Sequence, residues 1–224
     1  TPHLADACIR LGIPVRCAPA EVQALVPGQR VFGRALPATH VGSVDVFLEA
    51  IEFALPGDIL VADNGGRRDE SCIGDLMAQE AASAGLGGIV IWGLHRDTAD
   101  ITAIGIPLFS TGSIPTGPLS VSDRPDGALD SARVGEWVVG PADYVAGDDD
   151  GVLFLPADRI DELLTTAEGI RDTSPSGRPH PRRRPHAARP GALRRLPGGA
   201  RGEPRPHVPR APARGRRRDR GLRA

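Results

Sequence analysis

Two short turns in the chain combine residue types that can bind a small anionic ligand. The first is Cys72-Ile73-Gly74-Asp75-Leu76-Met77, where a glycine lets the backbone approach a ligand just before a predicted helix. The first amides of a helix have no partner within it, and the helix dipole favours an anion. The Leu76 and Met77 N–H groups could therefore hold a carboxylate. On this motif alone, the simpler interpretation is that Asp75 is an ordinary helix cap.

The second turn is Trp92-Gly93-Leu94-His95-Arg96-Asp97, at the end of a predicted buried strand. Ligands of open α/β sheets gather at strand ends. The planar guanidinium of Arg96 matches a carboxylate, and Asp97 offers the hard oxygens that a magnesium-type ion prefers. An ion pair beside a second helix cap is the alternative. His95 is interpreted as a neighbour of this site, because a hard cation prefers oxygen ligands.

Two acidic segments also invite a metal interpretation, namely Asp63-Asn64-Gly65-Gly66 and Asp148-Asp149-Asp150-Gly151. Both are typical of turns, since Asp and Asn favour turns and Gly supplies a positive φ. The acidic triplet also lacks the continuation that a calcium-binding loop requires. We predict a structural role for both segments.

The absence of lysine restricts the chemistry that the chain can perform. All 27 basic residues are arginine, so a lysine Schiff base is excluded as the electron sink of a carbon–carbon cleavage. A bound metal ion is the obvious replacement. The three cysteines form no CxxC pair, which favours reduced thiols in a cytoplasmic protein. No apolar run approaches the ~18 residues of a transmembrane helix, so no membrane partner is expected.

Strands and helices alternate along the chain up to about residue 110, after which strands and turns dominate. This order predicts a layered α/β domain over residues 1–173. Its core must be built from Val, Ile, Leu and Ala, because aromatic residues make up only 4% of the sequence. Helices are expected at 5–11, 44–54, 75–84, 97–104 and 160–171, and strands at 30–36, 58–62, 88–92, 107–109, 136–139, 144–146 and 152–155.

The charge of the chain is divided between two segments. Residues 1–173 carry 11 Arg and 26 acidic residues, a net charge of −15, whereas residues 174–224 carry 16 Arg and 2 acidic residues, a net charge of +14. The second segment holds 10 Pro and 7 Gly in 51 residues, which predicts a disordered basic tail. Three interpretations stay open. The tail could bind RNA or another polyanion, could be an inert extension, or could be translated in a shifted frame of GC-rich DNA.

Several motifs, taken in their order and spacing, resemble the RraA-like family. This family includes 4-hydroxy-4-methyl-2-oxoglutarate aldolases, related oxaloacetate decarboxylases and the regulator of ribonuclease E activity. The resemblance covers about residues 2–172. It runs through Pro56-Gly57-Asp58-Ile59-Leu60-Val61, Asp63-Asn64-Gly65-Gly66, Gly74-Asp75-Leu76-Met77-Ala78, Gly88-Ile89-Val90-Ile91, Gly93, Arg96-Asp97 and Asp148-Asp149-Asp150-Gly151-Val152.

The resemblance implies a swivelling β/β/α domain that assembles as homotrimers, often paired into hexamers. It implies that the amides of Gly74 to Met77 bind the pyruvate part of a 2-oxo acid and that Arg96 grips the same substrate. Asp97 would bind Mg²⁺ or Mn²⁺, and Asp75 would orient a water for proton transfer. The implied reaction is metal-dependent, class II cleavage of 4-hydroxy-4-methyl-2-oxoglutarate-type acids to pyruvate. Decarboxylation of oxaloacetate would use the same enolate.

A regulator that binds an RNA-degrading enzyme without catalysis is the alternative from a different function class. The complete set of Gly74–Met77 and Arg96-Asp97 favours the enzyme. The chain departs from the family at its C-terminal region, from which a neighbouring subunit supplies a carboxylate in family aldolases. Here that region is where the basic tail begins, and Glu168 and Asp172 are the remaining candidates.

Overall fold

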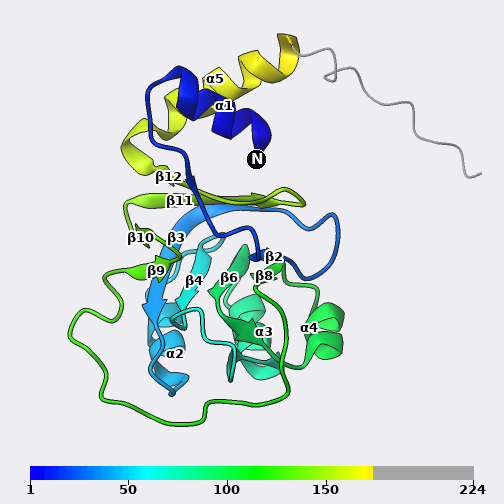
Figure 1. Ribbon diagram of the computed structural model, residues 1–224, viewed down its shortest axis with the longest axis vertical. Helices are drawn as coiled ribbons and strands as arrows, with labels where there is room; N and C mark the ends of the chain where they lie inside the picture. Colours follow the sequence, from blue (N-terminus) through cyan, green and yellow to red (C-terminus); the bar gives the residue numbers. More distant parts are fainter. Residues whose placement is uncertain (174–224) are drawn as a thin grey trace, which may run out of the picture. The chain divides into compact units, whose positions relative to one another are not determined.

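The structure is a computed structural model that describes residues 1–173. The predicted basic tail, 174–224, lies outside the described residues. Its predicted boundary with the catalytic domain falls at the end of the described part. Figure 1 shows the order of the elements along the chain. The helices are α1 (Pro2–Arg10), α2 (Asp45–Glu52), α3 (Asp75–Ser83), α4 (Thr98–Ile104) and α5 (Ile160–Thr173), with a 3-10 turn η1 (Ala157–Arg159) before α5.

One eight-stranded mixed sheet organises the fold, in the order β1-β12-β11-β3-β4-β6-β8-β2. Strands β3, β4, β6 and β8 run parallel to one another, and β1, β12 and β11 continue the sheet beyond β3 with antiparallel pairing. The bounds are β1 (Arg16–Cys17), β2 (Gln23–Ala24), β3 (Val31–Thr39), β4 (Ile59–Asp63), β6 (Gly88–Trp92), β8 (Leu108–Ser110), β11 (Asp143–Asp148) and β12 (Gly151–Pro156).

Two short two-stranded sheets complete the fold. Strands β9 (Ala132–Val134) and β10 (Trp137–Val139) form an antiparallel hairpin. Strands β5 (Ser71–Ile73) and β7 (Leu94–His95) pair in parallel. The second pair matters for function, because each of its strands leads directly into one of the two turns singled out above.

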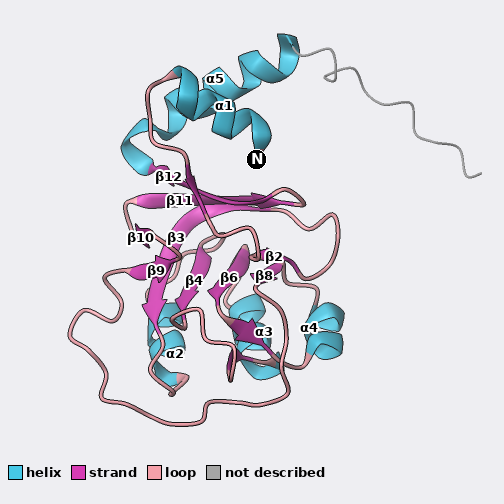
Figure 2. Cartoon of the chain, viewed as in Figure 1, coloured by secondary structure: helices cyan, strands magenta, loops and turns pink. Residues whose placement is uncertain are grey.

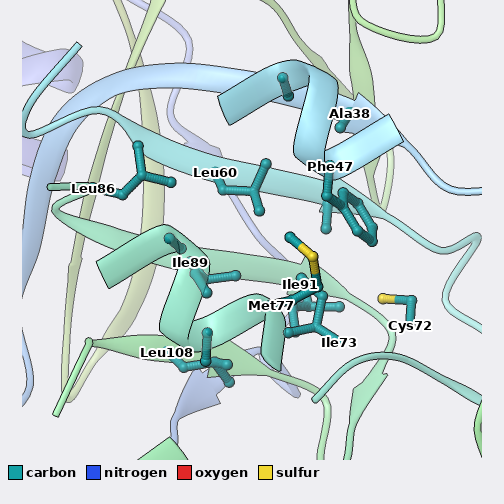
Figure 3. Packing of buried hydrophobic residues seen from close by; sticks show 14 of the residues in the cluster. Ala38, Phe47, Leu60, Cys72, Ile73, Met77, Leu86, Ile89, Ile91 and Leu108 are labelled. Carbon is teal, nitrogen blue, oxygen red and sulfur yellow. The ribbon is translucent and has the colours of Figure 1, made fainter. Parts of the chain in front are cut away.

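The layers follow from the burial of apolar side chains. Helices α2, α3 and α4 cover one face of the parallel strands (Figure 2). Figure 3 shows the resulting core, in which Phe47 of α2 and Met77 of α3 pack with Leu60 and Ile91 of the strands beneath them. A second core lies between the parallel strands and the antiparallel part, with Phe109 and Phe154 both fully buried. The layers are therefore the antiparallel part of the sheet, its parallel part and the helices, as predicted for a β/β/α domain.

A third apolar cluster joins the two ends of the described chain. Helices α1 and α5 pack against each other and against β11 and β12 through Cys8, Leu155 and Leu163. Along residues 1–173, no helix is both long and apolar enough to cross a bilayer.

The predicted helices and longer strands are confirmed, with ends that shift by a few residues. Helix α1 begins at Pro2 instead of Ala5, because proline suits the first turn of a helix. Five strands were not predicted, namely β1, β2, β5, β7 and β9. Each has only two or three residues, which is too short to show an alternation of apolar and polar side chains.

Candidate functional site

The two turns lie side by side because the strands before them are paired. In the β5–β7 pair, Ser71 is opposite Leu94 and Ile73 is opposite His95. The Arg96 N–H extends the pairing by donating a hydrogen bond of 3.0 Å to the Ile73 carbonyl. The chain segments that follow, with Gly74 on one side and Arg96-Asp97 on the other, are therefore held in contact.

Gly74 is required at this junction by the closeness of that contact. A Cβ atom at position 74 would lie 2.4 Å from Asp97 Oδ2, 3.0 Å from Arg96 Nε and 3.2 Å from Arg96 Cγ. The backbone of Gly74 is extended, with φ −129° and ψ −164°, so any residue could adopt its conformation. The missing side chain, rather than an unusual backbone angle, is what the site needs.

The N-terminus of helix α3 attracts two carboxylates. Gly74 is the cap residue and Asp75 begins the helix. The Asp75 N–H donates to Asp97 Oδ2 at 3.4 Å, and the Leu76 N–H donates to Asp75 Oδ1 at 2.8 Å. This is the behaviour expected of free amides at the positive end of a helix dipole. The carboxylates of the protein thus lie where the sequence predicted an anion, and Asp75 does not act as the cap residue itself.

Asp97 has a strained backbone. Its φ of 57° and ψ of 41° lie in the left-handed region, and it is the one non-glycine residue among residues 1–173 with a positive φ. Such a conformation costs about 1 kcal/mol or more and persists where the surroundings enforce it. In this conformation the Asp97 carboxylate lies near Gly74, and its Oδ2 forms an ion pair of 3.2 Å with Arg96 Nε. The ion pair that was the alternative interpretation of this turn is present, and both side chains stay partly exposed to solvent.

A cavity of about 410 Å³ opens beside these residues, a size within the roughly 300–1,000 Å³ of small-molecule sites. Gly74 and Arg96 line it, as do the polar residues Ser71 and Glu80. Leu76 and Met77 line it as well, whereas Asp75 and Asp97 lie outside its wall. Cys72, Ile73 and Met77 appear together in Figure 3, at the edge of the core. The full lining is Val44, Leu48, Ser71, Cys72, Ile73, Gly74, Leu76, Met77, Glu80, Arg96 and Pro118.

The sequence analysis missed a loop that supports Arg96. At Gly117, a Cβ would lie 2.8 Å from the Arg96 Nη1 atom, so the guanidinium rests against this glycine. Ser71 anchors the loop that contains Gly117, because its N–H and hydroxyl donate to the Thr116 carbonyl at 2.9 and 2.8 Å. The buried Glu70 carboxylate accepts the Leu119 N–H at 2.7 Å. The Gly117-Pro118 dipeptide is a turn signal that could have drawn attention to this segment.

The donor set around Asp97 suits one kind of metal ion. Within residues 1–173, no three or more His, Cys, Asp or Glu side chains are grouped so that they could enclose an ion. Asp97 and Asp75 offer the carboxylates at this point, and Asp97 Oδ2 already contacts Arg96 and the Asp75 N–H. A hard cation that keeps most of its waters and uses one or two carboxylates, such as Mg²⁺, fits this arrangement, whereas a cation that needs several protein ligands does not.

The other candidate residues have structural roles. His95 is buried, and its ring nitrogens contact Ser110 Oγ at 2.8 Å and Thr98 Oγ1 at 3.0 Å, while burial lowers its pKa. Both ring nitrogens therefore have partners within the protein, which agrees with its interpretation as a neighbour of the site. Asp63 accepts the N–H groups of Gly65 at 2.8 Å and of Arg133 at 3.0 Å. Asp148 accepts the Asp150 N–H at 3.0 Å, so both acidic segments form the turns that were predicted.

Comparison with known proteins identifies the family. Residues 1–154, more than half of the chain, match the RraA-like family, described as Aldolase/RraA. The chain belongs to this family. Its swivelling β/β/α fold is shared with solved RraA-like structures. RraAS2 of Streptomyces coelicolor, described as an unusual member of the RNase ES inhibitor RraA protein family, is 25% identical with a TM-score of 0.65, over 76% of this chain and 88% of that one.

Other relatives of this RraA-like chain carry other names. A Pseudomonas fluorescens protein named "Putative 4-hydroxy-4-methyl-2-oxoglutarate aldolase" is 32% identical over 112 residues, which are 49% of this chain and 66% of that protein. A Geobacillus kaustophilus structure titled S-adenosylmethionine: 2-dimethylmenaquinone methyltransferase is 30% identical with a TM-score of 0.59, over 70% of this chain and 96% of that one. The chain spans less than two thirds of the length of the first curated relatives it matches.

Proposed function

We propose that this RraA-like chain is a metal-dependent lyase that releases pyruvate from 2-oxo acids. The proposed reactions are the cleavage of 4-hydroxy-4-methyl-2-oxoglutarate-type acids and the decarboxylation of oxaloacetate. One observation carries the proposal: the start of helix α3 and Arg96 both line a cavity of about 410 Å³, and the Asp97 carboxylate, just outside that lining, contacts both. The aldolase name of the Pseudomonas fluorescens relative agrees with it.

The proposed binding mode follows from charge and shape. Arg96 presents a planar fork to the substrate carboxylate, and the Leu76 and Met77 N–H groups add hydrogen bonds from the helix terminus. The Asp75 carboxylate contacts the Leu76 N–H at 2.8 Å, so an incoming carboxylate would displace it. Hydrogen-bond donors from Arg96 and from the start of α3 favour an acid over the sulfonium cofactor of a methyltransferase.

The proposed chemistry assigns two further roles. Asp97 would hold Mg²⁺ or Mn²⁺ through one carboxylate oxygen, and the ion would polarise the 2-oxo group and favour the enolate form of pyruvate. Asp75, once displaced from the Leu76 N–H, would orient a water and exchange a proton with the substrate hydroxyl or with the pyruvate carbon. Arg96 would keep the substrate carboxylate fixed while the carbon–carbon bond breaks.

A coupled assay for pyruvate release tests the proposal. Oxaloacetate and 4-hydroxy-4-methyl-2-oxoglutarate are supplied to the full chain with Mg²⁺ or Mn²⁺, and again with a chelator. We expect metal-dependent turnover with at least one of them, lost in Arg96→Ala, which removes a partly exposed side chain and should leave the fold intact. Turnover of Arg96→Ala at the rate of the unsubstituted protein would refute the assigned site. Light scattering of the same sample tests the proposed homotrimer or hexamer.

A second candidate function is non-catalytic regulation of an RNA-degrading enzyme. The likeness to RraAS2, described as a member of an RNase inhibitor family, favours it. The two candidates differ in one measurement, because a regulator would slow RNA cleavage by its partner enzyme without releasing pyruvate from any 2-oxo acid. Inhibition that persists in Arg96→Ala would support the regulator, and it would show that the surface that binds the RNA-degrading enzyme does not depend on the cavity.

A further inference from the structure

The residues on either side of Arg96-Asp97 are joined by a hydrogen bond between their side chains. His95 precedes the pair and Thr98 follows it, and the His95 Nε2 atom lies 3.0 Å from the Thr98 hydroxyl. This contact closes a loop around the two residues that the proposed function uses for substrate and metal. His95 is 3% exposed, whereas Arg96 and Asp97 are partly exposed, so the turn is fastened to a buried ring.

The backbone of His95 is held on both sides. Its neighbour in β5 is Ile73, and an isolated bridge joins it to Ser113 on the other side. The His95 N–H donates to the Gly112 carbonyl at 3.0 Å, and the His95 carbonyl accepts the Ile114 N–H at 3.0 Å. His95 is therefore a fixed point from which its ring can hold the start of α4.

Ser110 sets the direction of the hydrogen bonds to the ring. Its hydroxyl lies 2.8 Å from His95 Nδ1 and 3.2 Å from both the N–H and the carbonyl of Gly112. A hydroxyl has one proton to donate, and the Gly112 carbonyl can only accept it. The Ser110 oxygen then accepts from the Gly112 N–H and from the Nδ1–H of the ring. In this arrangement His95 Nε2 carries no proton, so it accepts the Thr98 hydroxyl.

The bond from Thr98 to His95 bears on the unusual conformation of Asp97. An Asp that caps a helix usually has an extended backbone, and its carboxylate accepts an N–H group of that helix. Asp97 caps α4 with a left-handed backbone and makes no such side-chain bond. Its carboxylate contacts Arg96 and the Asp75 N–H instead. The surroundings must therefore keep Asp97 from the ordinary conformation of a cap.

We propose that His95 and Thr98 are positioning residues, whose hydrogen bond holds Asp97 in its left-handed conformation and so places its carboxylate beside Gly74. The inference rests on the proposed function for its consequence, because Asp97 is the residue proposed there to hold the metal ion. Without the Thr98 hydroxyl, the first residue of α4 is released from the ring. Asp97 then returns to the extended conformation, in which its carboxylate caps its own helix and leaves the site.

Mn²⁺ binding to the full chain, measured by electron paramagnetic resonance, tests the inference without any turnover. Thr98→Val removes the hydroxyl but keeps the shape of the side chain, and Thr98 is exposed, so the fold should persist. We expect the dissociation constant for Mn²⁺ to rise at least about tenfold, as is usual when a residue that orients a metal ligand is changed. Thr98→Ser keeps the hydroxyl and should restore binding.

Thr102→Val is the matched control. Thr102 lies one turn later on α4, and its hydroxyl donates to the Thr98 carbonyl at 2.7 Å. The substitution removes a hydroxyl from the same helix without touching the His95 ring, so it should leave Mn²⁺ binding unchanged. Where Mn²⁺ binding depends on Asp97, equal dissociation constants for Thr98→Val and Thr102→Val overturn the inference, as does a lack of recovery in Thr98→Ser.

A crystal structure of Thr98→Val separates the inference from the proposed function. We expect Asp97 to have a negative φ and its carboxylate to have lost the contact with Arg96 Nε. An Asp97 that keeps its positive φ and that contact overturns the inference, whatever the protein binds. Absence of Mn²⁺ binding, or binding that Asp97→Asn leaves unchanged, overturns the proposed metal site instead. The conformation of Asp97 in the crystal structure still decides the inference in that case.

Discussion

Substitution of Gly74 by alanine is the sharpest perturbation of the proposed site, because the structure separates its steric effect from any backbone effect. The extended backbone at position 74 accepts alanine without strain. The new Cβ, however, would lie 2.4 Å from Asp97 Oδ2 and 3.0 Å from Arg96 Nε. Ordinary contact requires roughly 3.5 Å, so the carboxylate must retreat by about 1 Å. The substitution therefore displaces the groups proposed to hold metal and substrate while leaving their chemistry unchanged.

The expected size of the effect follows from that displacement. A misplacement of about 1 Å costs on the order of 100-fold in rate, which corresponds to about 2.7 kcal/mol of transition-state stabilisation. The cost to folding should be smaller, about 1 kcal/mol, because Asp97 is partly exposed and can swing outward. Gly74→Ala is thus expected to lose most activity in the pyruvate-release assay and to unfold at a denaturant concentration close to that of the unsubstituted protein.

Gly169→Ala is the matched control for this experiment. Gly169 lies on the exposed side of helix α5, and a Cβ there would have no neighbour within 4 Å. Alanine should leave activity unchanged and stabilise the helix by up to about 1 kcal/mol. The reasoning is refuted if Gly74→Ala retains kcat/KM within twofold of the unsubstituted protein. It is refuted equally if the lost activity is accompanied by global unfolding.

Three further predictions concern the site and the buried titratable groups. Asp97→Asn should abolish metal-dependent turnover but change the free energy of unfolding by less than about 1 kcal/mol, because asparagine tolerates the left-handed backbone; chemical denaturation of the variant measures this. Burial raises the pKa of the Cys72 thiol, so a disulfide reagent at pH 8 should modify the exposed Cys17 quickly and Cys72 only after unfolding. Burial lowers the pKa of His40, so the unfolded chain binds the proton more readily and stability should fall as the pH drops from about 7 toward 5. Replacing His40 by Gln should flatten that decline in thermal melts recorded across this pH range.

The elements could be predicted from sequence wherever a periodic pattern was long enough. Val44, Phe47 and Leu48 predicted an amphipathic helix, and α2 is there. The pattern could not show that Phe47 lies in the core whereas Val44 and Leu48 line the cavity. This difference depends on where α3 packs, and α3 follows α2 by more than twenty residues in the chain.

The geometry of the candidate site could not be predicted from local sequence either. The residue types at Gly74, Arg96 and Asp97 indicated anion and metal chemistry. Their contact depends on the pairing of β5 with β7, strands of three and two residues that carry no readable alternation. The left-handed conformation of Asp97 is likewise imposed by its surroundings, because nothing in its own residue type requires it. The residue types of the site could therefore be predicted from local sequence, whereas their spatial arrangement depends on strand pairing in the tertiary structure.

Positioning of Arg96 depends on residues outside both turns, and Glu70 is the one whose role can be tested. Its side chain is 1% exposed, and its carboxylate accepts the Leu119 N–H at 2.7 Å. This bond fixes the loop whose Gly117 supports the Arg96 guanidinium. If Arg96 holds the substrate carboxylate, releasing the loop should weaken binding more than it slows the chemical step.

Glu70→Ala is accordingly expected to raise KM for the cleaved 2-oxo acid at least tenfold with a much smaller change in kcat. Glu70→Gln keeps an acceptor for the Leu119 N–H and should restore most of the binding. Asp143→Ala is the matched control, because Asp143 is a buried carboxylate that accepts the Gly140 N–H at 2.9 Å on the antiparallel part of the sheet. It should lower stability and leave KM unchanged. Equal KM values in the two alanine variants would mean that Glu70 stabilises the fold without positioning Arg96.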